Sequence, residues 1–524
     1  MFATADKRRS RLIRTAAIAA VAAGALLLSA CSGTTSSSSS ASTTLTVAST
    51  SGPTSMDPAL AGNGIPLVWY MNLGYASLIR RDADGTPKPG LATKWGYSDD
   101  RLTFTLQLRK DVKFSDGSKL TADAVVASLQ RYQKQGQFAA TYLSDVTSIE
   151  ATGPLEVTIK LSAPNPLLPY GFDQGGIAGD IIAPAGLADT KKLGTATYGA
   201  GPYMLDGKST ISNSQYVFVK NPYYYDKSAQ HYSKITVKVI SDANSVLSAV
   251  RSGQVQVAQG SSGNAAAAKS AGLGITSAPA GMVGMYIADI DGNITPALKD
   301  VRVRQALNYA LDRKAITKSV YGDYGIPTDQ FVPKGTAGYL DSLEKQYPYD
   351  PAKAKELLKE AGYADGFGFT LAEQPGTDNG DLLAQAMAAQ WKEIGVNVTL
   401  KSFPSFADYI SGVVTKTIPT TTLTFNYSVQ LVDTQQLATN PAAYNFLGFN
   451  DDKANGLAAE QRKYDIDSPE GKKAAENSET YMVQNAFAVP VASTSAILFS
   501  SKKVAGLDFT SYPWPDPTNW KPAN

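Results

Sequence analysis

The fold is indicated most directly by residues 300–313, which read Asp300-Val301-Arg302-Val303-Arg304-Gln305-Ala306-Leu307-Asn308-Tyr309-Ala310-Leu311-Asp312-Arg313. Apolar side chains recur there at intervals of three and four residues, which predicts a helix with one buried face: Val303, Ala306, Leu307, Ala310 and Leu311. Asp300 is a typical N-cap residue and predicts where this helix begins. The apolar side chains form a core stripe and provide no chemistry of their own.

Similar helices and alternating strands occur on both sides of this stretch. Asp350-Pro351 predicts an N-cap followed by proline in the first helical position, and Gly362 predicts the end of that helix. A further helix, with Leu383, Met387, Trp391 and Ile394 on its apolar face, ends at Gly395 and leads into a strand at 396–400. Apolar and polar residues alternate at 102–108, 155–161 and 235–239, as in half-buried strands. Helices and strands that alternate at the spacing of βαβ units predict α/β lobes.

The N-terminal segment has the three parts of a secretory signal. Basic residues precede an apolar run at 16–28, which is too short to cross a bilayer because a membrane helix needs about 20 residues. Small residues then precede the single cysteine, in Leu28-Ser29-Ala30-Cys31. This pattern resembles the lipobox of bacterial lipoproteins, which implies a signal peptide at 1–30 and a lipid on Cys31. Residues 31–44 then form a Ser/Thr-rich tether. Arg8-Arg9 leaves twin-arginine export open beside the Sec route.

Composition excludes several classes of function. The chain has 48 basic and 46 acidic residues, and without residues 1–30 it keeps 43 basic and 45 acidic ones, so no nucleic-acid partner is indicated. A single cysteine permits no internal disulfide. A single histidine, His231, argues against zinc sites and against serine or cysteine triads, and no metal or cofactor is expected. A carboxylate pair for glycoside chemistry stays open, although nothing in the sequence argues for an enzyme.

Several short blocks occur in a fixed order from about residue 45 to Pro490. They resemble the signature blocks of family 5 extracellular solute-binding proteins, the peptide- and nickel-type binding components of ABC importers. Besides residues 300–313, the matching blocks are Asp57-Pro58, Leu91-Ala92-Thr93-Lys94-Trp95, Val112-Lys113-Phe114-Ser115-Asp116-Gly117, Thr121-Ala122-Asp123-Ala124-Val125, Gly199-Ala200-Gly201-Pro202-Tyr203, Asn221-Pro222-Tyr223 and Tyr349-Asp350-Pro351-Ala352-Lys353-Ala354.

The resemblance implies an α/β, two-lobed periplasmic-binding-protein-like fold with an extra domain, three domains in all. Domain I would comprise 45–82, 191–278 and 491–524, domain II 83–190, and domain III, the second ligand lobe, 279–490. The ligand would lie between domains I and III. We interpret the signature blocks as architectural: the block at 114–117 would fix a turn, and Arg302 and Arg304 would cap or bridge structure.

The resemblance also suggests where a ligand would bind. Peptide-binding members place an aspartate in domain III against the amine of the peptide, and Gln430 takes that position here, with Asp433 as the alternative partner. A glutamine carries no charge, so a charge-assisted hydrogen bond would become an ordinary one. The candidate ligand-binding residues are Asn426, Tyr427, Ser428, Gln430, Asp433, Gln259, Ser261, Tyr286, Trp69 and Tyr70. For each, a place in the core or on the surface is the alternative.

The predicted function is therefore that of a non-enzymatic, lipid-anchored binding component of an ABC importer. It would be a monomer on the extracytoplasmic face of the cell membrane, delivering an oligopeptide or dipeptide to the permease subunits. An oligosaccharide or other neutral solute is the alternative ligand, because Asn426, Tyr427 and Gln430 offer neutral amides and an aromatic face. A secreted hydrolase and a ligand sensor are further alternatives.

Overall fold

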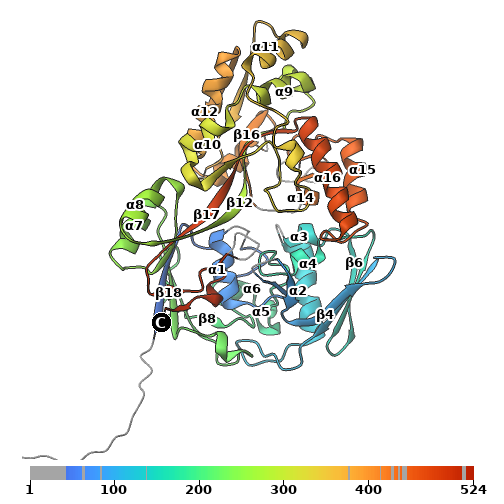
Figure 1. Ribbon diagram of the computed structural model, residues 1–524. Coiled ribbons are helices and arrows are strands. Elements are labelled where there is room, and N and C mark those ends of the chain that lie inside the picture. Colours follow the sequence, from blue (N-terminus) through green and yellow to red (C-terminus); the bar gives the residue numbers. More distant parts are fainter. Residues whose placement is uncertain are drawn as a thin grey trace, which may run out of the picture. The chain divides into compact units, whose positions relative to one another are not determined.

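The two longest strands, β12 (Gly274–Ile287) and β17 (Ala488–Ser500), pair antiparallel in the middle of an 11-stranded mixed sheet (Figure 1). The strand order is β15-β14-β16-β12-β17-β11-β1-β10-β9-β8, and β13 also pairs with β17. The computed structural model describes residues 43–61, 65–82, 85–136, 139–375, 378–413, 415–426, 430–434, 437–438, 445–509 and 515–523. They belong to one compact unit, Ser42–Asn524.

One half of the large sheet is built from the N-terminal strands. β1 (Thr44–Ser49) runs parallel to both β10 (Lys234–Val239) and β11 (Val257–Gln259), and β9 (Gln215–Lys220) and β8 (Tyr203–Leu205) extend the sheet antiparallel. Ile235 and Val237 are fully buried, so the alternation that predicted this strand is confirmed.

The other half carries the predicted helices. β16 (Thr420–Asn426) pairs antiparallel with β12. β14 (Phe367–Ala372) runs parallel to both of its neighbours, β16 and β15 (Val396–Lys401). Three predicted helices are present as α9 (Val301–Tyr309), α11 (Pro351–Glu360) and α12 (Gly380–Glu393), and Asp300 and Asp350 cap the first two as predicted. The helix α9 ends before Ala310 and Leu311, because Asp312 already caps the next helix, α10 (Arg313–Tyr321).

A separate four-stranded sheet has the order β4 (Ala92–Tyr97), β5 (Thr103–Leu108), β7 (Glu156–Leu161), β6 (Val146–Gly153). The helix α2 (Ala122–Gln135) packs against it, and Thr121 is its N-cap, because the Thr121 side chain accepts from the Ala124 amide. Asp116 Oδ1 accepts from the Ser118 amide at 2.9 Å, and Gly117 has φ of 87°, so the predicted turn at 114–117 is confirmed.

The remaining helices and strands complete the described part of the chain. The helices are α1 (Ile65–Gly74), α3 (Ala139–Tyr142), α4 (Leu168–Gly171), α5 (Pro184–Ala188), α6 (Thr190–Leu193), α7 (Ala243–Arg251), α8 (Ala265–Ser270), α13 (Phe406–Val413), α14 (Gln430–Thr434), α15 (Asp452–Gln461) and α16 (Pro469–Gln484). The strands are β2 (Ile79–Arg81), β3 (Pro87–Pro89), β13 (Gly325–Pro327), β18 (Val504–Ala505) and β19 (Lys521–Pro522). In the described part of the chain, no helix is both long and apolar enough to span a membrane.

Two large hydrophobic cores hold these elements together. The first core joins side chains of the N-terminal strands and of the four-stranded sheet, among them Leu45 and Phe104. The second core runs from Met282 to Ala492 and contains the apolar faces of α9, α11 and α12. The α/β class is as predicted, whereas the predicted domain boundaries stay predictions.

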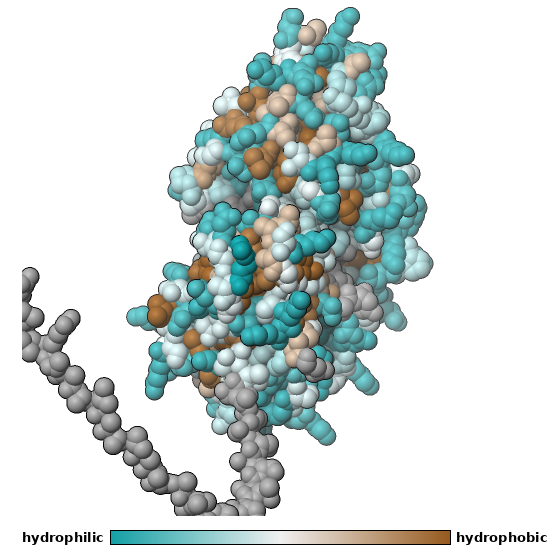
Figure 2. Space-filling view, turned by 60° about the vertical axis from the view of Figure 1, so that its left-hand side comes forward, coloured by the Kyte–Doolittle hydropathy of each residue, from teal (hydrophilic) through white to brown (hydrophobic). Residues whose placement is uncertain are grey.

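In Figure 2, polar side chains cover most of the face shown, and apolar side chains are interspersed among them. Large apolar side chains that are exposed come from separate elements: Leu60, Ile211, Tyr223, Ile294, Ile326, Tyr349 and Leu382. Single exposed apolar residues of this kind are normal on a protein surface and indicate no binding site.

Candidate functional site

The second-lobe residues predicted to contact a ligand follow β16. Asn426 is its last residue and pairs with Gly281 of β12, next to a β-bulge between Pro279 and Gly281. Tyr427 and Ser428 lie outside the described residues, as do the side chains of Asn426, Gln430 and Asp433. The backbone places Gln430 at the start of α14 and Asp433 one turn later. Their contact with a ligand stays a prediction.

Gln259 ends β11 and is held by the chain that follows β1. Its Oε1 accepts from the Thr50 amide at 3.1 Å and from the Thr50 hydroxyl at 2.9 Å. β11 begins at Val257, and the residue before it is also tied to β1: Gln256 donates from its amide to Thr46 O at 2.7 Å, and its side chain accepts from the Thr46 amide at 2.8 Å. The first-lobe candidate is therefore fixed in place, with its carbonyl oxygen already used.

The loop that contains the candidate Ser261 contacts the second half of the chain through its neighbour Ser262. Asp378 Oδ2 accepts from the Ser262 hydroxyl at 2.6 Å and from its amide at 3.2 Å. Asn379, with φ of 53°, donates from Nδ2 to the same hydroxyl and to Val320 O, both at 2.9 Å. Sequence reasoning missed this contact, although Asp378-Asn379-Gly380 is a turn signal and asparagine tolerates a left-handed backbone.

The aromatic candidates of the first lobe are core residues of α1. Trp69 and Tyr70 are both fully buried. The Trp69 ring packs edge-to-face on Trp520 at 5.1 Å, and the Tyr70 hydroxyl donates to Ser51 O at 3.0 Å. Burial raises the pKa of Tyr70, so its hydroxyl stays protonated. The structure gives both side chains core packing, and their contact with a ligand stays a prediction.

Tyr286 lies on β12 and is also fully buried. Its ring packs edge-to-face against Phe446 at 6.5 Å, and burial raises the pKa of its hydroxyl. This hydroxyl and Trp69 Nε1 have no hydrogen-bond partner in the part of the chain that the structure describes. A buried donor without an acceptor is costly, so these two groups keep unused hydrogen-bonding capacity.

The two arginines of the opening stretch have the architectural roles that we predicted. Arg302 pairs with Asp300 at 2.6 Å and donates to Glu360 O at 2.9 Å on the surface. Arg304 is buried and donates to four backbone carbonyls, of Leu298, Lys299, Asn485 and Ala486. Burial lowers the pKa of Arg304 to about 10, so the guanidinium remains charged at pH 7.

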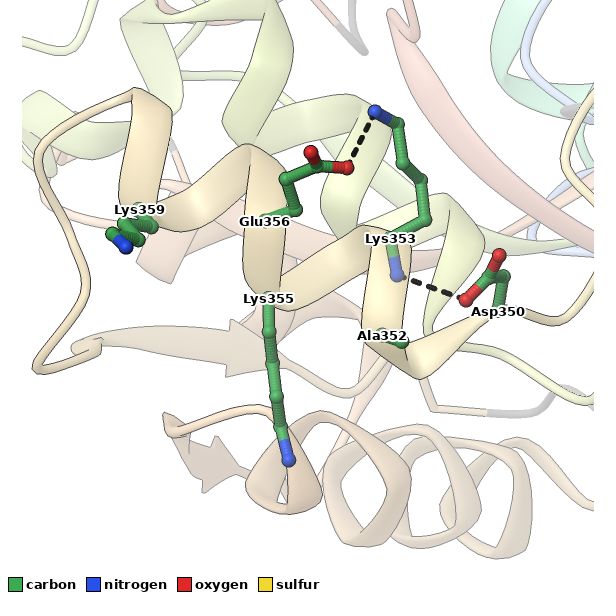
Figure 3. A pocket seen from close by; sticks show the side chains of 6 residues that line it. All are labelled: Asp350, Ala352, Lys353, Lys355, Glu356 and Lys359. Atoms are coloured by element: carbon green, nitrogen blue, oxygen red, sulfur yellow. Dashed lines mark hydrogen bonds and ion pairs between the residues drawn. The ribbon is translucent and has the colours of Figure 1, made fainter.

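A shallow depression on α11 has none of the features of a ligand site. Its lining residues belong to one helix and the residue before it (Figure 3): Asp350, Ala352, Lys353, Lys355, Glu356 and Lys359. Lys353 pairs with Glu356 at 2.8 Å, and Asp350 Oδ1 accepts from the Lys353 amide. Lys355 and Lys359 point in different directions, so these side chains do not converge on a point. Within the described residues, no group of three metal-ligating side chains occurs.

Comparison with known proteins gives one family and one fold. The family model "Bacterial extracellular solute-binding proteins, family 5 Middle" matches residues 86–458. The glutathione-binding protein GsiB of Salmonella paratyphi A is 32% identical over 363 residues, which cover 68% of this chain and 69% of the relative. GsiB of Escherichia coli O157:H7 is 31% identical over 359 residues, covering 67% and 68%.

Solved structures share the fold at lower sequence identity. The dipeptide-binding protein of Pseudoalteromonas sp. SM9913 in complex with Met-Leu aligns with a TM-score of 0.79 at 18% identity, over 92% of this chain and 100% of that protein. DppA of Helicobacter pylori, in complex with the peptide STSA, gives 0.78 at 20% identity, over 92% and 98%. The predicted fold class, a periplasmic-binding-protein-like α/β fold, is thereby confirmed.

Proposed function

The chain belongs to the family 5 bacterial extracellular solute-binding proteins, and from this premise we propose that it captures a small peptide for an ABC importer. The observation that carries the proposal is the match to glutathione-binding relatives at 31–32% identity over two thirds of the chain. Glutathione is a modified tripeptide. The structural likeness to proteins solved with Met-Leu and STSA shows the fold in which such a ligand is held.

The proposal includes a lipid anchor on Cys31. The segment Leu28-Ser29-Ala30-Cys31 and the Ser/Thr-rich tether at 31–44 support it, although both lie almost wholly outside the described residues. A diacyl lipid on Cys31 would hold the folded unit on the extracytoplasmic face of the membrane, close to the permease. Incorporation of labelled palmitate into the wild-type chain, and its loss in Cys31→Ser, tests the anchor separately from the ligand.

The ligand is proposed to lie between the lobe built on β1 and β11 and the lobe built on β12, β14 and β16. Gln259 and Ser261 would face it from the first lobe, and the segment from Asn426 to Asp433 from the second. Because Gln430 is neutral, we propose Asp433 as the partner of a peptide amine. An oligosaccharide is the second candidate, favoured by the neutral side chains at 426–430.

Thermal unfolding of the chain from Ser42 onward, with and without candidate ligands, tests this proposal. The panel contains glutathione, di- to pentapeptides, their N-acetylated forms and matched oligosaccharides. A ligand at 100 times its Kd stabilises the folded state by about 2.7 kcal/mol, which is measurable as a shift in Tm. We expect a shift with free-amine peptides, a smaller one with the N-acetylated forms, and loss of that difference in Asp433→Asn.

Other outcomes exclude parts of the proposal. A shift with oligosaccharides alone would refute peptide binding and make Gln430 a reader of hydroxyl groups. An equal shift with free and acetylated peptides would leave peptide binding intact but reject an acidic partner for the amine. Gln430→Ala is the matched control for Asp433→Asn, because it removes a neutral side chain three residues away on the same helix. It should keep the difference between free and N-acetylated peptides.

A further inference from the structure

Besides the paired strands β12 and β17, a second contact region joins the two halves of the molecule. It consists of residues 97–101, 142–145 and 164–170 on one side, and of residues 431–432 and 458–467 of the second half of the chain on the other. We call this region the latch. Figure 1 shows α15 and α16 next to α3, α4 and β6, and the contacts below agree with that placement.

Two ion pairs cross the latch. Arg462, directly after α15, pairs with Asp145 and also donates from Nε to Pro164 O at 3.0 Å. Arg101 pairs with Asp465 at 2.7 Å, and its guanidinium stacks on the Tyr97 ring at 4.5 Å. The side chains of Arg462 and Asp145 are only 19% and 18% exposed, so solvent screens this pair less than an open surface pair.

An apolar contact and a hydrogen bond to a carboxylate lie beside the ion pairs. Leu167 packs with Leu431 of α14 and Ala458 of α15, and Tyr142, Val432 and Ile466 border this small cluster. Tyr170 donates from its hydroxyl to Asp467 Oδ2 at 3.1 Å. The latch therefore buries apolar surface as well as charge. Its second-half members lie on α14, on α15 and in the loop between α15 and α16, and its other members lie on or near β4, α3 and α4.

The first-core side of the latch is braced from behind. Asn165 donates from Nδ2 to Tyr142 O at 2.9 Å and accepts at Oδ1 from the Leu167 amide at 3.0 Å, and the Tyr97 hydroxyl donates to Asn165 O. These bonds fix the loop that presents Pro164 and Leu167. A preformed surface of this kind loses little conformational freedom when the opposite side docks.

We propose that the latch is a closing device, which stabilises the closed arrangement of the two halves by the charge pairs of Arg462 with Asp145 and of Arg101 with Asp465. β12 and β17 connect the two cores as continuous strands, and two register shifts of the β-bulge type lie in this pair, where the backbone can bend. When the two halves open by bending at these strands, the two sides of the latch move apart, and when the halves close, the latch contacts form. This inference rests on the proposed function only in that the closed form is taken as the one that retains ligand.

Distance measurements on the ligand-free protein test the latch without any knowledge of the ligand. The folded unit from Ser42 contains no cysteine, because Cys31 is the single cysteine of the chain. Lys134→Cys on α2 and Lys472→Cys on α16, both exposed, can therefore carry a donor and an acceptor dye. Single-molecule energy transfer between them then reports the open and closed populations.

Reversal of one charge should open the protein. We expect Arg462→Glu to raise the ratio of open to closed molecules roughly tenfold, because a close charge pair becomes a repulsive one. Asp145→Arg combined with Arg462→Glu restores an attractive pair and should return the ratio towards that of the parent. Lys463→Glu is the matched control: it makes the same charge change one residue away, but its partner at 2.6 Å is Glu460 on its own side.

Three results would overturn the latch. They are an unchanged ratio in Arg462→Glu, an equal change in Lys463→Glu, and a double variant as open as Arg462→Glu alone. Arg101→Glu, at the second ion pair, provides an independent variant if Arg462→Glu fails to melt cooperatively. If the latch holds but no peptide or sugar binds, the proposed ligand class fails and the closing device stands.

Discussion

Arg304 lends itself to a quantitative prediction, because its neighbour Arg302 offers an internal control. Both arginines lie in α9, two positions apart. Arg304→Ala removes a buried guanidinium that binds the end of α16 and the turn before α9. Arg302→Ala removes a guanidinium whose side chain is 44% exposed. We expect the two variants to differ strongly in stability.

The magnitude follows from the acceptors that Arg304 leaves behind. Of its four carbonyl partners, those of Leu298 and Ala486 belong to buried residues, at 0% and 1% exposure, and cannot turn to water. Each buried acceptor left unpaired costs about 1–3 kcal/mol, so the free energy of unfolding should fall by about 2–6 kcal/mol. Arg302→Ala breaks a surface pair, for which the loss is about 0.2–1 kcal/mol.

Guanidinium unfolding monitored by circular dichroism and by tryptophan fluorescence measures both variants. Trp391 reports on this core, since its Nε1 donates to Leu307 O of α9 at 2.8 Å. Arg304→Lys keeps the charge but lacks the planar fork, so its stability should lie between those of wild type and Arg304→Ala. If Arg304→Ala unfolds within 1 kcal/mol of Arg302→Ala, the assignment of Arg304 as a structural clamp is wrong.

Three further variants test local features of the fold. Asp180 is buried with both carboxylate oxygens unpartnered among the described residues, and burial raises its pKa well above the usual value. The folded state therefore binds the proton more tightly than the unfolded state, so the stability of the wild-type protein should fall as the pH rises from about 4. Unfolding midpoints measured at pH 4.5 and 8 should differ less in Asp180→Asn than in wild type. An equal pH dependence in both proteins would contradict this prediction. Gly199→Ala places a Cβ 2.3 Å from Gly74 O, so overpacking should lower the free energy of unfolding by about 1–3 kcal/mol and lower Tm. Gly207→Ala, where a Cβ meets nothing within 4 Å, should leave Tm unchanged. Equal Tm values of the two variants would contradict the close approach at Gly199. Thr121→Ala should cost about 1 kcal/mol through loss of the N-cap bond in the same unfolding assay, and an unchanged midpoint would show that the cap is dispensable.

Local sequence signals predicted the elements well because their causes are local. Asp300, Asp350 and Thr121 each accept from a backbone amide two or three residues ahead, so the sequence contains both partners of each bond within one turn. The predicted helix extended two residues beyond the observed end of α9 at Tyr309, because the next helix begins directly after it. Apolar periodicity continued to Leu311, but the Asp312 cap of α10 requires the chain to leave the helix first.

Contacts across the chain could not be read in the same way. Arg302 and Arg304 look alike in sequence, and only the carbonyls near Asn485, some 180 positions away, make one of them a clamp. The same holds for the bond of Ser262 to Asp378, and for the latch pair Arg462 and Asp145. The helix α1 is apolar on all sides, so no periodicity could show whether Trp69 faces a core or a ligand.

The blocks that carry the family resemblance contact one another, which explains what they can and cannot reveal. Ser115 donates from its amide to Gly199 O at 2.9 Å, Asn221 donates to Gly201 O at 2.8 Å, and Asp350 donates from its amide to Tyr309 O at 2.8 Å. Each bond joins two blocks that are distant in sequence. These residues therefore encode the scaffold and place the lobes. The resemblance therefore predicted the fold and the solute-binding role, whereas the proposed ligand residues at 426–433 lie outside these blocks.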